Sequence, residues 1–116
     1  DHAPHSAEEK SRGLEGSAFG IVGLETAFPL LYTHLVRKGV ISLERLFELM
    51  SSAPRRRFGL PGTGDDHAVF EVTTPYTIDS SRFVSMGRST PFDGWTVYGR
   101  CLETVHNGKT IYKYTI

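Results

Sequence analysis

The sequence has one cysteine, no long apolar run and no excess of charge of either sign. Cys101 has no partner for an internal disulfide, and a cysteine-based structural zinc site needs two or more thiolates, so we expect a reducing compartment, the cytoplasm. No apolar stretch approaches the roughly 20 residues that cross a bilayer. Thirteen basic residues balance thirteen acidic ones, so neither nucleic acid nor a membrane is expected as a partner.

The remaining composition is that of a foldable chain, with 39% hydrophobic and 22% charged residues. Its 116 residues suffice for one small domain and not for two full ones. The chain begins with Asp1 rather than methionine, and no signal-peptide pattern follows. We therefore expect a piece of a longer protein.

Residues 1–23 show no sustained apolar period and contain several glycines, namely Gly13, Gly16, Gly20 and Gly23. This pattern predicts a loop. Loops of such length are uncommon in compact domains unless they are functional or disordered, and we interpret this one as functional.

Two amphipathic helices are predicted after this loop. The first covers residues 24–38 with an apolar stripe and a C-terminal cap at Gly39, and Pro29 means that it either kinks or begins near Ala27. The stripe is expected to be exposed in this piece and to favour self-association; it comprises Leu24, Phe28, Leu31 and Leu35. The second helix begins after the N-cap Ser42, and we expect Pro54 to end it. Its predicted buried face comprises Leu43, Leu46, Phe47 and Met50.

Beyond Phe58 the residues are typical of turns and strands. A buried strand is predicted over residues 68–72, and two more over 96–98 and 102–105. Asn107 and Gly108 predict a tight hairpin turn, with residues 109–114 as the returning strand. The sequence thus predicts helices followed by a mostly antiparallel β segment.

The residues that carry chemistry lie at the start of the chain. Asp1, His2 and His5 place one carboxylate and two imidazoles within five residues, and these groups ligate zinc and transfer protons near neutral pH. Pro4 restricts Ala3 to an extended conformation, so Asp1 and His5 can contact different parts of one ligand. The alternative is a frayed, solvated terminus.

Longer stretches of sequence carry a resemblance to a known family. Residues 1–5, the charged residues 8–10, residues 19–30, residues 89–94 and residues 99–109 together resemble the C-terminal part of bacterial class I dihydroorotase, of the amidohydrolase superfamily. The resemblance implies an α/β fragment that contains the last loop and helices of a (β/α)8 barrel and part of a small, mostly antiparallel β-sandwich. It places the end of the barrel at residues 1–58 and the sandwich portion at 59–116. Between Gly59 and Val69 the chain is shorter than is common in the family.

The resemblance also implies site residues and a reaction. Asp1 matches a catalytic aspartate that ligates the more buried of two zinc ions and takes a proton from the attacking hydroxide. His5 matches the histidine that binds the carboxylate of the substrate, and the backbone of Ala18, Phe19 and Gly20 matches a loop that touches the pyrimidine ring. Glycine there permits close backbone approach. The implied enzyme interconverts N-carbamoyl-L-aspartate and L-dihydroorotate in pyrimidine biosynthesis.

The other metal ligands of that family precede Asp1, so the resemblance predicts that this chain alone is inactive and does not retain zinc. An alternative is a noncatalytic homologue that serves as a structural partner of aspartate transcarbamoylase. A homodimer is a further possibility that the sequence leaves open. Outside the first loop, neither the cluster of Asp65, Asp66 and His67 nor the run of arginines at residues 55–57 is predicted to bind a ligand.

Overall fold

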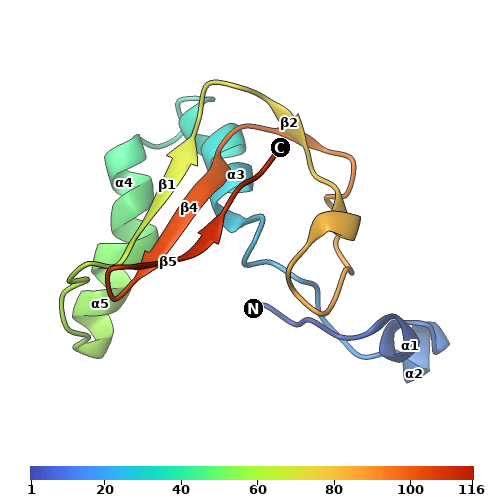
Figure 1. Ribbon diagram of the computed structural model, residues 1–116. Coiled ribbons are helices and arrows are strands. Elements are labelled where there is room, and N and C mark those ends of the chain that lie inside the picture. The colour runs from blue at the N-terminus through green and yellow to red at the C-terminus, as the bar shows by residue number, and fades with distance from the viewer. The chain divides into compact units, whose positions relative to one another are not determined.

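The computed structural model describes residues 1–116 and divides into two compact units, each assembled from segments that are distant in sequence (Figure 1). One unit comprises residues 1–28 and 76–97, and the other comprises residues 29–75 and 98–116. The expected boundary between residues 58 and 59 concerns the domains of a whole protein and stays a prediction. None of the helices combines the length and the hydropathy that a membrane span requires.

The unit that contains the N-terminus has two short helices, α1 (Ala7–Lys10) and α2 (Gly13–Gly16), so the prediction of a continuous loop over residues 1–23 was wrong there. Two short strands, β2 (Tyr76–Thr77) and β3 (Thr96–Val97), pair antiparallel, and a 3-10 turn, η3 (Ser80–Arg82), follows β2. The apolar side chains that are buried in this unit are Val22, Phe28, Ile78 and Val97.

The first predicted helix begins at the later of the two expected positions. Helix α3 (Ala27–Leu31) continues into a π-helical turn, η1 (Tyr32–Val36), and Gly39 follows with φ +73°. Pro29 lies in the first turn, where backbone N–H groups have no partner within the helix, so its missing N–H costs nothing. Gly39 therefore has the positive φ that the predicted C-terminal cap requires.

The second helical run is longer than predicted. Helix α4 (Leu43–Phe47), the π-helical turn η2 (Glu48–Ser52) and helix α5 (Ala53–Phe58) follow one another without a break. The Ser42 hydroxyl caps the run by accepting from the Arg45 amide at 3.1 Å. Pro54 does not end the helix, because it lies in the first turn of α5 after a wider π turn.

The predicted apolar faces are only partly buried. Leu46 is 1% exposed, but Phe47 and Met50 on the same helix are 49% and 40% exposed. In the earlier stripe, Phe28 is buried whereas Leu24 is 73% exposed. The expectation that the whole stripe is exposed was therefore wrong for Phe28, which is part of the core of its unit.

The second unit contains a three-stranded antiparallel sheet in the order β1-β4-β5, whose strands lie side by side in Figure 1. The strands are β1 (His67–Glu71), β4 (Arg100–His106) and β5 (Lys109–Lys113). The predicted hairpin is confirmed, since Asn107 and Gly108 have φ of 50° and 73° and connect β4 to β5. The first strand is exposed over its first three residues, so the prediction that it is buried was wrong.

Side chains tie distant segments of this unit together. The Thr33 hydroxyl accepts from the Tyr98 amide at 2.8 Å, and the Arg37 guanidinium lies 3.6 Å from the centre of the Tyr98 ring. At the hairpin, an Asp66 carboxylate oxygen accepts from the Asn107 amide at 2.6 Å. These contacts hold the ends of β4 to the chain that precedes the sheet.

Candidate functional site

The segment of residues 1–5 is hydrogen-bonded to residues 21–24 of the same unit. His2 forms a parallel β-bridge with Ile21, and the Ala3 amide donates to the Ile21 carbonyl at 2.7 Å. The amides of Gly23 and Leu24 both donate to His2 Nδ1, at 3.0 and 3.2 Å. Because Nδ1 accepts these bonds, the proton of the neutral His2 ring is on Nε2.

Two glycines pack directly against this segment. A Cβ on Gly20 would lie 2.5 Å from the Ala3 Cβ, and a Cβ on Gly87 would lie 2.7 Å from the Pro4 Cα and carbonyl carbon. Gly20 also has φ +102°, which L side chains rarely adopt. We predicted that Gly20 permits a close approach to a ligand; in the structure the approach that requires glycine there is to Ala3.

His5 is oriented by the first turn of helix α1. Its Nδ1 lies 3.3 Å from Glu9 Oε2, and the Glu9 carboxylate also accepts from the amide and hydroxyl of Ser6 at 3.1 and 3.0 Å. The Ser6 hydroxyl accepts from the Glu9 amide in return, which completes a capping box. The backbone bond from Ser6, then its hydroxyl bond, then the bond from His5 lower the pKa of Glu9 below its ordinary value.

The charge state of Glu9 defines the role of the His5 ring. An ionised carboxylate only accepts hydrogen bonds, so the bond to Glu9 places a proton on His5 Nδ1. The Nε2 atom is then left to accept a bond from a neutral ligand group, or to donate one to an anion when the ring is protonated.

The loop of Ala18, Phe19 and Gly20 is attached to the same helix. The Lys10 ammonium donates to the carbonyls of Ala18 and Gly20 at 2.7 and 2.9 Å, and the Ala18 amide donates to the Glu9 carbonyl at 3.0 Å. The Phe19 amide, the Phe19 carbonyl and the Gly20 amide make no hydrogen bond within the chain. Two backbone donors and one acceptor of the predicted loop are therefore available to a ligand.

The loop that carries Gly87 is anchored by Glu25. Its carboxylate accepts from the amides of Val84 and Ser85 at 2.9 and 3.0 Å, and from the Ser85 hydroxyl at 2.6 Å. Burial acts to raise the pKa of Glu25, but the bonds from Ser85 and Val84 together bring it below its ordinary value. An ionised Glu25 thus holds the segment that leads to Gly87.

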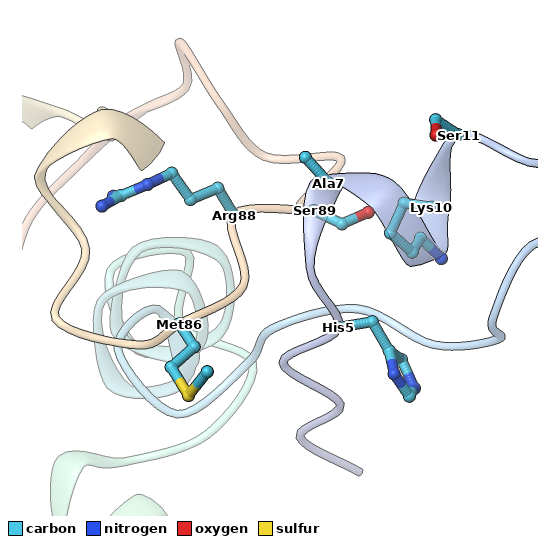
Figure 2. Close-up of a pocket in the computed structure, with 7 residues that line it drawn as sticks. All are labelled: His5, Ala7, Lys10, Ser11, Met86, Arg88 and Ser89. Carbon is cyan, nitrogen blue, oxygen red and sulfur yellow. The ribbon is translucent and has the colours of Figure 1, made fainter.

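A cavity of about 390 Å³ opens beside His5. Figure 2 shows seven residues that line it: His5, Ala7, Lys10, Ser11, Met86, Arg88 and Ser89. The Arg88 side chain points away from His5 and donates to the carbonyls of Ser80 and Phe83, at 2.7 and 3.2 Å (Figure 2). Its guanidinium therefore supports its own loop, and the Lys10 ammonium is bonded to the carbonyls of Ala18 and Gly20, so His5 is the basic side chain that remains beside the cavity.

The structure separates the predicted site residues into three places. His5 lines the cavity of Figure 2, and the loop of Ala18, Phe19 and Gly20 lines a second hollow. Lys10 lines both hollows. Asp1 is exposed, lines neither hollow, and its carboxylate makes no hydrogen bond within the chain.

No group of three or more His, Cys, Asp or Glu side chains lies close enough together to hold a metal ion. The cluster near His67 has structural contacts instead, since His67 Nδ1 bonds the Asp65 carbonyl and Asp66 bonds His106 and Asn107. That these residues bind no ligand stays a prediction.

Sequence reasoning missed four residues that organise the site: Glu9, Lys10, Glu25 and Gly87. The spacing of Ser6 and Glu9 is that of a capping box and could have revealed the start of α1. No local signal identifies Glu25 or Gly87, because their partners are far away in the sequence.

Comparison with known proteins shows what the chain is similar to. No protein-family model matches the chain. It is 48% identical over 119 residues to the dihydroorotase of Shouchella clausii and 44% identical over 119 residues to that of Halalkalibacterium halodurans. Over nearly all of its length, the chain is similar to part of these dihydroorotases. Each alignment covers 97% of this chain and 28% of the relative, so the chain spans less than a third of those relatives.

Solved structures confirm the predicted fold class of this chain. A dihydropyrimidinase from Brevibacillus agri matches with a TM-score of 0.85 at 22% identity, and a D-hydantoinase from a Bacillus species with 0.83 at 23%. Each match covers 97% of this chain and 27% of the other. The matched region is the C-terminal part of these amidohydrolase-type structures.

Proposed function

We propose that the protein to which this segment belongs is a dihydroorotase. It would interconvert N-carbamoyl-L-aspartate and L-dihydroorotate, by closing or opening a cyclic amide, and so serve pyrimidine biosynthesis in the cytoplasm. The observation that carries the proposal is the 44 to 48% identity to curated dihydroorotases over 97% of the chain. The fold of two cyclic-amide hydrolases supports the same class of reaction.

In this proposal Asp1 supplies the proton-transfer group. Its carboxylate is exposed and free of hydrogen bonds within the chain, which suits a ligand of a metal ion whose other ligands come from residues outside this chain. Two zinc ions would supply an activated water and polarise the ring carbonyl. Asp1 would then accept the proton of the attacking water and pass it to the leaving ring nitrogen.

His5 and the loop of Ala18, Phe19 and Gly20 would bind the substrate. With Nδ1 held by Glu9, a protonated His5 can donate from Nε2 to the substrate carboxylate, and charge-assisted bonds of this kind are strong. The free amides and carbonyl of the loop match the carbonyl and N–H groups at the edge of a cyclic amide.

The second candidate is a noncatalytic homologue that acts as a structural partner of aspartate transcarbamoylase. Such a protein needs neither a free carboxylate at position 1 nor an oriented imidazole at position 5. The presence of Asp1 and of the Glu9 bond to His5 favours the enzyme.

The test is an assay of dihydroorotate hydrolysis by the full-length protein, before and after treatment with a chelator. We expect activity that the chelator abolishes and added zinc restores, because the metal activates the water. The isolated residues 1–116 should be inactive, since they hold no metal cage. A full-length protein without activity in the presence of zinc would favour the structural partner.

A further inference from the structure

Helix α1 is only four residues long, yet two adjacent side chains at its end bind two different parts of the candidate site. Glu9 bonds the ring of His5, and Lys10 bonds the loop that follows helix α2. The two contacts lie on one turn that the capping box fixes at its start. His5 and the loop are therefore positioned by one element.

The contact of Lys10 is the more constraining of the two. One ammonium bridges two carbonyls separated by a single residue, and the Ala18 amide is bonded to the Glu9 carbonyl as well. Hydrogen bonds to a charged group are stronger than those between neutral groups. The bridge fixes the Ala18–Phe19 and Gly20–Ile21 peptide groups, which flank the free Phe19–Gly20 peptide. The Phe19 side chain is 84% exposed and adds little packing.

The bridge also determines which loop groups remain for a ligand. Lys10 occupies the carbonyls of Ala18 and Gly20, so the groups left are the amide and carbonyl of Phe19 and the Gly20 amide. Without the ammonium, both carbonyls would be released and the loop could turn its peptide groups. The order of donors and acceptors presented to a ligand depends on Lys10.

We propose that Lys10 is a positioning residue for the reaction: it bridges the carbonyls of Ala18 and Gly20 and thereby fixes the backbone that binds the cyclic amide. The proposal rests on the dihydroorotase function proposed above. Lys10 itself has no contact with the reacting atoms in this account. Its loss should weaken substrate binding rather than the chemical step.

The test compares Lys10→Met with Lys10→Arg and with Arg12→Met in the full-length protein. Methionine keeps the length of the side chain without the charge, and arginine keeps a cation with several N–H donors. Arg12 is an exposed cation on the same segment whose ion pair to Glu8 is 4.0 Å long, which makes it a matched control. Hydrogen exchange of peptides covering residues 1–5 and 17–22 measures how well the loop's amides are protected, independently of activity.

For Lys10→Met we expect the KM for dihydroorotate to rise about tenfold or more and kcat to change less than about threefold, the pattern of lost binding shared by substrate and transition state. The two peptides should exchange about tenfold faster, because the Ala18 and Ala3 amides depend on the loop. Lys10→Arg should recover most of both effects, and Arg12→Met should match the wild type. Peptides of the β4–β5 hairpin should not change in any variant.

An unchanged KM in Lys10→Met would overturn the proposal, as would a raised KM with unchanged loop exchange, which indicates direct contact with the substrate. A wild-type protein that does not hydrolyse dihydroorotate would instead overturn the proposed function. In that case faster loop exchange in Lys10→Met would still support the bridge, and unchanged exchange would refute it.

Discussion

At the scale of single residues, the candidate site depends on backbone contacts that only glycine permits. Gly87 is buried against Pro4 and His5, and the atoms that a Cβ would meet are backbone atoms, which cannot turn aside as a flexible side chain can. Sequence inspection singled out Gly20 but gave no reason to select Gly87. The partner of Gly87 is more than 80 residues away by sequence number, so only the fold reveals it.

We predict that Gly87→Ala destabilises the unit that contains the N-terminus. The added Cβ would lie 2.7 Å from two Pro4 atoms and 2.8 Å from the His5 carbonyl oxygen, and overpacking of this kind costs about 1 to 3 kcal/mol. Denaturant unfolding of the full-length protein measures the loss. Gly62→Ala is the control, because a Cβ there meets nothing within 4 Å, and it should leave the free energy of unfolding within about 1 kcal/mol of wild type.

At the scale of elements, the sequence predicted what local chemistry determines. The Ser42 cap, the Gly39 position after the first helix and the hairpin at Asn107 and Gly108 all follow from short-range rules. The pairing of β2 with β3 was missed, because two-residue strands carry no periodicity. Continuation of the helix past Pro54 was missed because a π turn precedes it.

The attachment of the loop over residues 83–89 should depend on pH through Glu25. Its pKa in the folded protein lies below the ordinary value of 4.5, so the stabilisation is present above pH 4.5 and is lost as the pH falls through the folded pKa. We expect the stability difference between wild type and Glu25→Gln to shrink over that acidic range. Chemical unfolding at a series of pH values measures it, and a difference that stays constant down to pH 3 would contradict the role of Glu25.

At the scale of the whole molecule, local patterns give the kinds of elements but not how they combine. Each compact unit joins an early segment to a late one. Glu25 and Gly87 make such contacts in one unit, and the Thr33 bond and the pairing of β1 with β4 do so in the other. The resemblance to dihydroorotases could be recognised because long motifs lie along the sequence. The full set of metal ligands could not be derived from this sequence. Asp1 is one candidate ligand, and no group of three or more His, Cys, Asp or Glu side chains in the chain could hold a metal ion.

The most direct test of the account is the activity of Asp1→Ala in the full-length protein. Asp65→Ala is the matched control, because Asp65 is also exposed and its carboxylate makes no hydrogen bond within the chain. A general base typically contributes about 10²- to 10⁴-fold to the rate. We therefore expect kcat for dihydroorotate hydrolysis to fall by about 10²-fold or more in Asp1→Ala and to stay at the wild-type value in Asp65→Ala. An Asp1→Ala variant that retains wild-type kcat would contradict the assignment of Asp1 to the reaction.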